Sequence, residues 1–111
     1  MILDTEELLE EIDGDRELLG QMFDVFEPDA DRRLALIREA VKTGDSATLT
    51  AEAHALKGSV GNFFATPVFG TAYQLEIMGR DNSISGAAET LATLETQMTS
   101  LKQAIRELIA G

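Results

Sequence analysis

The amino-acid sequence predicts an all-α protein, an antiparallel four-helix bundle with a short additional N-terminal helix. Apolar residues recur at three- and four-residue spacing along nearly the whole chain, which is the period of an amphipathic helix. No β-branched run alternates as a half-buried strand would, and only two prolines interrupt the pattern. With 111 residues the chain has room for one core, so we expect a single domain over residues 1–111.

The first predicted helix is short. Asp4 followed three residues later by Glu7 resembles a capping box, in which each side chain bonds the backbone of the other residue. Asp13 and Gly14 end the element, because glycine accommodates the left-handed turn that closes many helices. We expect this helix to pack across the bundle as a lid.

A long acidic element follows over residues 15–43. Pro28 divides its apolar stripe, and proline removes a backbone donor and clashes with the preceding helical turn. We therefore expect Pro28 either to kink this element or to begin a second helix at its first turn. Gly44 then supplies a stop and Asp45 a new N-cap.

Three more helices complete the predicted bundle. The first covers residues 46–61 or 46–62, and the last covers about 85–109. Between them we expect Thr66 to cap a helix that has Pro67 at its first helical position, where a missing N–H costs nothing. This helix extends to residue 78 or 79. Four long amphipathic segments joined by short connectors are typical of an antiparallel bundle.

The sequence gives no sign of a bound cofactor or metal ion. One histidine among scattered carboxylates lacks ligand spacing, and no HExxH or paired CxxC motif occurs. No phosphate-binding glycine loop or ATP site occurs either, so the chain should not phosphorylate itself from ATP. We expect the following aromatic and methionine side chains to pack in the core rather than line a cofactor pocket: Met22, Phe23, Phe26, Phe63, Phe69, Met78 and Met98.

The charge of the chain excludes two classes of partner. Twenty acidic residues against nine basic ones give a net charge of -11, which repels nucleic acids and anionic lipid surfaces. There is no cysteine, which fits a reducing compartment, and no signal peptide or apolar run of about 20 residues is visible. We expect a cytoplasmic protein without nucleic-acid or membrane partners, and its polar faces predict a monomer.

The single histidine, His54, is the leading candidate for chemistry. Leu56 and Val60 belong to the apolar stripe of its helix, and at about 100° per residue His54 stands about 200° from Leu56. The imidazole is therefore expected to point away from the core. Two interpretations remain open at this point, an unremarkable surface histidine and a histidine displayed for reaction.

The neighbours of His54 favour display for reaction. Glycine in a helix interior costs about 1 kcal/mol relative to alanine, yet two glycines lie on the face from which His54 projects. Lys57, one turn on, is a cation within reach of a group attached to the imidazole and would offset a phosphoryl charge. Small side chains would let another protein approach closely, and four of them are candidate docking residues: Thr50, Ala51, Gly58 and Gly61.

The segment that begins at His54 resembles the signature of the histidine-containing phosphotransfer (HPt) domain family. That signature reads approximately H-x-L-K-G-[SA], with a small residue after the following turn. The acidic helix with Pro28, the connector at residues 43–45 and the Leu75-Glu76 pair extend the resemblance over nearly the whole chain. The matching residues are His54-Ala55-Leu56-Lys57-Gly58-Ser59, followed by Asn62 and Ala65.

The resemblance implies a carrier that moves a phosphoryl group between aspartates of receiver domains, in response regulators or hybrid histidine kinases. His54 would be phosphorylated on the nitrogen distal to the backbone, Lys57 would steady the phosphoryl charge, and Gly58 would leave space for the receiver. Glu76 matches a position where the family often has a glutamine or glutamate that can hydrogen-bond the imidazole, although an ordinary exposed carboxylate is equally open. Such a carrier needs no cofactor of its own, because Mg²⁺ is expected in the partner.

Two positions depart from the family pattern. Phe64 stands where members commonly have glycine, which affects the shape of the turn, and Pro67 opens the next helix where many have other residues.

Two other functions compete with phosphotransfer. A hydrolase that used His54 as a general base would need a pocket that an exposed helix face lacks. A binding-only helical adaptor would dock a receiver or kinase without passing phosphate. The presence of Lys57 and Gly58 in register with His54 favours phosphotransfer.

Overall fold

Five α-helices and one short 3-10 turn make up the protein, and the computed structural model describes all 111 residues. The predicted all-α class is confirmed. None of the helices is long and apolar enough to cross a membrane. The elements are α1 (Thr5–Glu11), α2 (Arg16–Thr43), α3 (Ser46–Gly61), α4 (Thr66–Arg80), η1 (Ile84–Gly86) and α5 (Ala87–Ala110).

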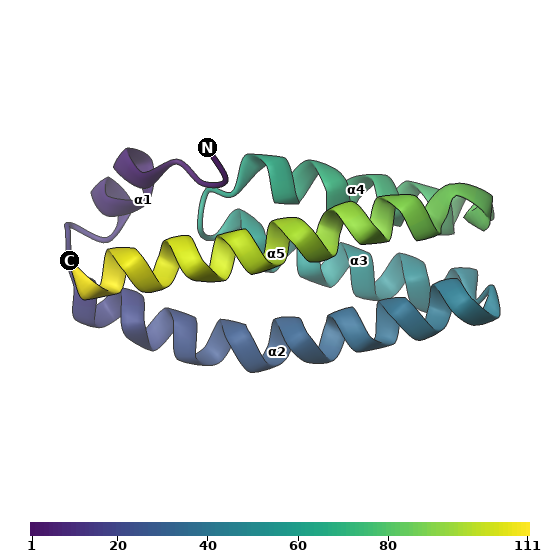
Figure 1. Cartoon of the computed structure of the whole chain (residues 1–111), viewed down its shortest axis with the longest axis horizontal. Coiled ribbons are helices and arrows are strands. Elements are labelled where there is room, and N and C mark those ends of the chain that lie inside the picture. The colour runs from purple at the N-terminus through teal and green to yellow at the C-terminus, as the bar shows by residue number, and fades with distance from the viewer.

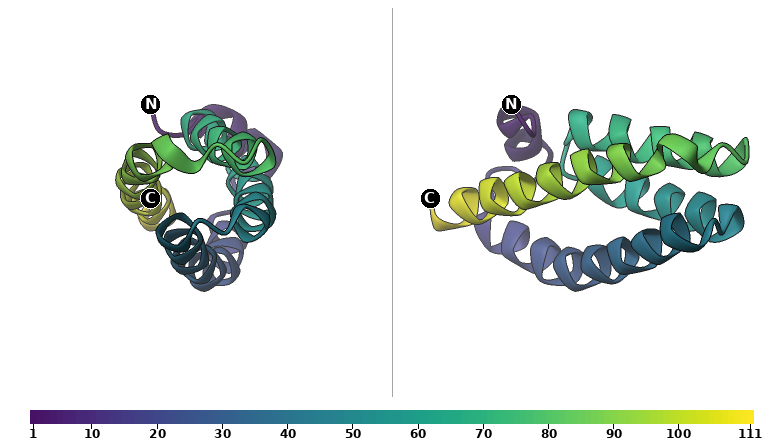
Figure 2. Two further views of the ribbon diagram at one scale, coloured as in Figure 1. Left: turned by 90° about the vertical axis from the view of Figure 1, so that its right-hand side faces the viewer. Right: turned by 45° about the vertical axis from the view of Figure 1, so that its right-hand side comes forward.

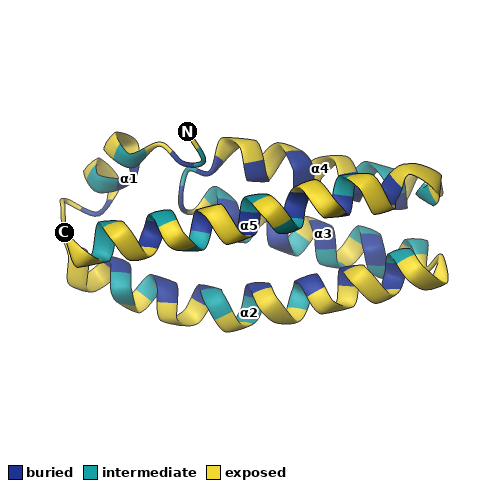
Figure 3. Ribbon diagram, viewed as in Figure 1, coloured by how far each residue is buried: buried dark blue, intermediate teal, exposed yellow.

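The four long helices stand around one core. α2 packs against α3 and α5, and α4 packs against the same two helices. Consecutive long helices run in opposite directions (Figure 1), and the end-on view in Figure 2 shows the four around a common centre. Buried residues recur as bands along each long helix (Figure 3), and their apolar side chains form a single cluster. Of the aromatic and methionine residues expected there, these are buried or partly buried: Met22, Phe23, Phe26, Phe63, Met78 and Met98.

α1 lies at the end of the bundle that also holds the α3–α4 turn and the C-terminus (Figure 1). Asp4 caps it as predicted, because its Oδ1 accepts the backbone N–H of Glu7 at 3.0 Å. The reciprocal half of the capping box is absent, since the Asp4 N–H donates instead to the carbonyl of Phe64 at 2.9 Å. With Leu3 and Leu8 buried in the core, the expected lid is fixed at this end of the bundle.

Pro28 lies inside α2, which continues unbroken from Arg16 to Thr43. The expectation that Pro28 begins a second helix is wrong, and Figure 1 shows α2 gently bowed rather than sharply bent. Pro28 is exposed, and so is Asp24, whose carbonyl loses its helical partner to the proline. Because a helix that wraps a core bows outward to solvent, water can bond that carbonyl and the helix tolerates the proline.

The start of α4 differs by one residue from the expectation. Thr66 is the first helical residue rather than the cap, Pro67 takes the second position, and Ala65 is the N-cap without a side-chain hydrogen bond. Proline is tolerated there because the first N–H groups of a helix have no intrahelical partner. Ala65 is buried, so apolar packing rather than capping decides this residue. At α3, by contrast, Asp45 caps as predicted.

Phe64 closes the turn between α3 and α4 in the left-handed region, with φ at +55°. Glycine adopts this conformation without steric cost, whereas other L residues lose about 1–2 kcal/mol. The side chain of Phe64 packs against the core, which offsets part of that cost. Phe64 therefore closes a turn in a conformation that glycine would adopt without strain.

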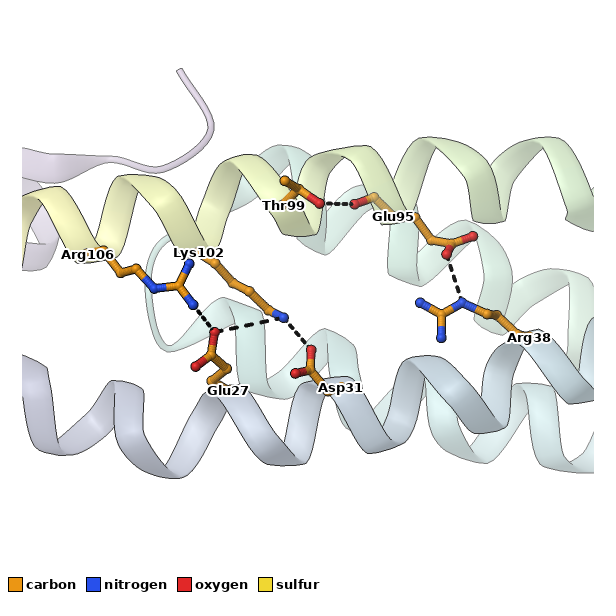
Figure 4. A network of polar contacts seen from close by, with 7 residues as sticks. All are labelled: Glu27, Asp31, Arg38, Glu95, Thr99, Lys102 and Arg106. Atoms are coloured by element: carbon orange, nitrogen blue, oxygen red, sulfur yellow. Dashed lines mark hydrogen bonds and ion pairs between the residues drawn. The ribbon is translucent and has the colours of Figure 1, made fainter.

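Ion pairs line the exposed seam between α2 and α5 (Figure 4). Lys102 and Arg106 of α5 pair with acidic residues of α2. Further along, the Arg38 Nε atom lies 2.8 Å from Glu95 Oε2. Exposed pairs contribute only about 0–1 kcal/mol each, so this seam adds little to the stability that the core provides.

α3 and α4 approach each other closely at Gly79, a buried residue of α4. A Cβ added to Gly79 would stand 2.4 Å from Thr50 Oγ1 and 2.8 Å from the backbone nitrogen of Thr50. A side chain can rotate away from such a contact, but a backbone atom moves only if α3 moves. The missing side chain of Gly79 is therefore what lets the two helices pack at this distance.

Replacing Gly79 with alanine should lower the free energy of unfolding by about 1–3 kcal/mol, the usual cost of an overpacked core. Gly70 in the same helix is the matched control, because a Cβ there would meet no atom within 4 Å. Gly70→Ala should stabilise the protein by up to about 1 kcal/mol through helix propensity. Urea denaturation followed by circular dichroism measures both variants. A stabilising Gly79→Ala would contradict the close approach.

Candidate functional site

His54 stands in the middle of α3 on the face turned away from the core. Leu49, Leu56 and Val60 of the same helix are fully buried, whereas 67% of the His54 side chain is exposed. The orientation predicted from the helical period is confirmed. The imidazole is therefore open to a reactant that arrives from solvent.

Glu76 of α4 is buried between the helices and contacts the imidazole of His54. Its side chain is only 4% exposed, and its Oε2 lies 3.1 Å from His54 Nδ1. The interpretation of Glu76 as an ordinary exposed carboxylate is therefore wrong. α4 turns this residue toward α3 one helical turn before the close approach at Gly79.

Two cations complete the surroundings of Glu76. Lys57 Nζ lies 2.8 Å from its Oε1, and Arg80 Nη2 lies 2.6 Å from its Oε2. The ammonium of Lys57 also stands 4.8 Å from the ring centroid of Tyr73 and 5.7 Å from that of Phe69. Only 17% of the Lys57 side chain is exposed, and its ammonium lies between the Glu76 carboxylate and the two aromatic rings.

Glu76 is ionised in spite of its burial. Burial alone would raise the pKa of this carboxyl, but hydrogen bonds and charges from Lys57 and His54 outweigh it and hold the pKa below its ordinary value. An ionised carboxylate only accepts hydrogen bonds, so Nδ1 of His54 is the protonated nitrogen and donates to Glu76 Oε2. This tautomer leaves Nε2 with the free lone pair on a largely exposed ring.

The four candidate docking residues lie in two kinds of surroundings. Ala51 and Gly58 are exposed, and a Cβ on Gly58 would meet no atom within 4 Å. Gly61 lies under the ring of Phe69, whose nearest atom is 3.4 Å from the position of a Cβ. Thr50 lies in the α3–α4 contact described above. The open surface beside His54 is thus formed by Ala51 and Gly58, while the other two contribute to packing.

Sequence reasoning misses three residues of this site. Arg80 follows Glu76 by four residues, and an acid–base pair at that spacing is a signal that the sequence contains. Phe69 is expected in the core but is 39% exposed, because it lies over Gly61 at the surface. Tyr73, one turn on, is 42% exposed and extends the same aromatic face. The four-residue spacing of the two rings is the available signal for that face.

Comparison with protein families places the chain in one of them. The family model described as the Hpt domain matches residues 21–104. This stretch contains all of α3 and α4, and with them every residue of the site described above. The chain belongs to the Hpt domain family, and it is therefore a phosphotransfer protein of the kind that acts in phosphorelays.

A solved structure shares the whole fold. The crystal structure of histidine-containing phosphotransfer protein B (HptB) from Pseudomonas aeruginosa PAO1 matches with a TM-score of 0.89, over 98% of this chain and 95% of that chain. The sequence identity is 22%, so this likeness is one of fold. A search of curated protein sequences finds no match.

The lowered pKa of Glu76 makes stability depend on pH. The ionised form of Glu76 stabilises the folded protein at pH values above the ordinary carboxyl pKa of 4.5. This stabilisation is lost as the pH falls through the lower pKa that Glu76 has in the folded protein. We expect the free energy of unfolding of the wild type, minus that of Glu76→Gln, to be largest at neutral pH and to shrink in acid. Urea denaturation of both proteins over a pH series tests this. A difference that stays constant with pH would contradict an ionised Glu76.

Proposed function

We propose that this chain is a histidine phosphocarrier in a two-component multistep phosphorelay. His54 accepts a phosphoryl group from the aspartate of one receiver domain and passes it to the aspartate of another. The observation that carries the proposal is the 3.1 Å contact of an ionised Glu76 with Nδ1, because it leaves Nε2 as a nucleophile on an exposed ring. Membership of the Hpt domain family supports phosphotransfer in general.

The transfer asks for little chemistry from the carrier itself. Nε2 attacks phosphorus in line, the bond between phosphorus and the aspartyl oxygen breaks, and its electron pair returns to the aspartate carboxylate. Lys57, one turn from His54, would stabilise the charge on the transferred oxygens. The receiver would supply the aspartate and Mg²⁺. The chain thus acts as a carrier without a cofactor of its own and without autonomous kinase activity.

A receiver must bring its aspartate within bonding distance of Nε2. Ala51 and Gly58 offer the low, open surface that such an approach requires. We therefore take these two residues as the centre of the docking surface, with Thr50 and Gly61 at its edge. A monomer in the cytoplasm would suffice for this role.

Replacing His54 with glutamine should abolish phosphoryl uptake, because an amide has no nucleophilic ring nitrogen. The wild type, incubated with Mg²⁺-loaded and aspartyl-phosphorylated receivers, should acquire an acid-labile, base-stable label that maps to His54 and moves to a second receiver. His54→Gln should acquire none and keep its circular dichroism spectrum. If the folded wild type binds receivers but is never labelled, the chain is a binding-only adaptor.

Replacing Lys57 with glutamine should slow transfer by about 10- to 100-fold. Removing a hydrogen-bond donor from a fully enclosed oxyanion hole slows a reaction more, because water does not screen the charges there as it does at this open site. Rapid-quench measurement of label transfer from one receiver gives the rate. Lys42→Gln is the matched control, because it removes the same charge from an exposed position near the end of α2. Equal slowing in both variants would assign the effect to net charge rather than to the position of Lys57.

A further inference from the structure

Two exposed aromatic rings of α4 lie against the ammonium of Lys57. The ring centroid of Tyr73 is 4.8 Å from Lys57 Nζ, and that of Phe69 is 5.7 Å from it. Both distances fall within the range of about 6 Å over which the face of an aromatic ring attracts a cation. Neither residue belongs to the apolar core cluster, so packing in the core does not explain where the two rings lie.

We propose that Tyr73, supported by Phe69, is a positioning residue that places the ammonium of Lys57 for the charge of the phosphoryl group on His54. This inference rests on the proposed function and adds two residues of α4 to it. The bonds that form and break in the transfer are those given above, and neither ring takes part in them.

A spacing of four residues on each helix brings the rings to the lysine. Lys57 and Gly61 are one turn apart on α3, and Phe69 and Tyr73 are one turn apart on α4, so each pair shares one face of its helix. The ring of Phe69 covers Gly61, where a Cβ would stand 3.4 Å from the nearest ring atom. The ring of Tyr73 lies against Lys57. The two pairs thus face each other across the α3–α4 contact.

The ammonium placed in this way is a near neighbour of the reactive ring. Lys57 Nζ lies 2.8 Å from Oε1 of Glu76, and His54 Nδ1 lies 3.1 Å from Oε2 of the same carboxylate. Because the ammonium lies between this carboxylate and the aromatic rings, the rings limit how far it can swing away from His54.

An aromatic ring suits this role better than a second anion would. The face of a ring attracts a cation through its quadrupole but carries no net charge. A carboxylate at position 73 would neutralise the ammonium and would itself repel a phosphoryl group. An ammonium has three N–H donors, and Glu76 is the only carboxylate paired with it, so donors remain for phosphoryl oxygens. The ring therefore positions the charge without cancelling it.

Placing the ammonium before the receiver arrives lowers the cost of using it. A lysine side chain in water samples many rotamers, and fixing it during the transfer costs conformational entropy. A cation that already stands where charge develops needs little reorganisation. We therefore expect the rings to act on the transfer rate through Lys57.

A measurement that needs no receiver tests the contact. The chain has three lysines, Lys42, Lys57 and Lys102, and replacing each with glutamine assigns their side-chain NMR signals. The ring current of an aromatic side chain shifts protons over its face upfield, so the ε-methylene signal of Lys57 should lie upfield of the other two. This shift should shrink in Tyr73→Leu and persist in Tyr73→Phe, which keeps the ring without its hydroxyl group.

The rate of transfer from a saturating, Mg²⁺-loaded and phosphorylated receiver tests the role. Tyr73→Leu should slow transfer by about 2- to 10-fold, the range expected when a partly exposed cation–π contact is lost. Phe69→Leu should slow it less, because its ring is further from Nζ. Tyr73→Phe should restore most of the lost rate. When Lys57 is already glutamine, Tyr73→Leu should cause no further slowing.

Two other roles for Tyr73 predict different results. If its ring only docks the receiver, Tyr73→Leu slows transfer equally with Lys57 and with glutamine at that position. If its hydroxyl group contacts the phosphoryl group, Tyr73→Phe is as slow as Tyr73→Leu. Either result, or an unchanged Lys57 signal in Tyr73→Leu, would overturn the inference. The proposed function would then stand as long as His54 itself is labelled.

Failure of the proposed function gives a different outcome. If no receiver labels His54 in the folded wild type, the inference falls together with the proposed function, whatever the lysine signals show. Should Tyr73→Leu fail to fold, Phe69→Leu decides by the same two measurements. An unmoved Lys57 signal in Phe69→Leu, or equal slowing with and without Lys57, would then overturn the inference.

Discussion

The close approach of α3 and α4 at Gly79 is the constraint on which the site depends. Because only a hydrogen stands where a Cβ would meet the backbone of Thr50, the helices pack closely enough for Glu76, one turn earlier, to reach the imidazole. With the helices further apart, Glu76 would face water and Lys57 would lose the carboxylate that holds it. A residue without a side chain therefore determines the geometry of residues that carry the chemistry.

The buried carboxylate is tolerated because groups that favour its negative charge contact both of its oxygens. An unpaired ionised carboxylate is costly in a protein interior, whereas Glu76 has an imidazole N–H and two cations in contact. The same arrangement keeps positive charge beside His54 on a molecule whose net charge of -11 would otherwise repel a phosphoryl group. The cations near His54 thus attract a phosphoryl group that the net charge of the molecule repels.

The helices and the orientation of His54 are predictable from the sequence, because both follow from the period of apolar residues around Leu56 and Val60. Two expectations are wrong for a common reason: that Pro28 begins a second helix and that Thr66 is an N-cap. Each applies a local rule, whereas the bowing of α2 (Figure 1) and the burial of Ala65 are set by the packed bundle. The contact of Glu76 with Nδ1 also depends on packing, since it needs the distance between two helices, which periodicity does not give.

Every contact of the site comes from α3 and α4, two consecutive helices joined by a tight turn at Phe64. α2 and α5 supply half of the core and a seam of ion pairs, and none of the polar contacts around the imidazole. Their outward surfaces are thus free to diverge while the chemistry stays the same. Where several carriers of this fold share one cell, such divergence is a means of insulating one signalling line from another.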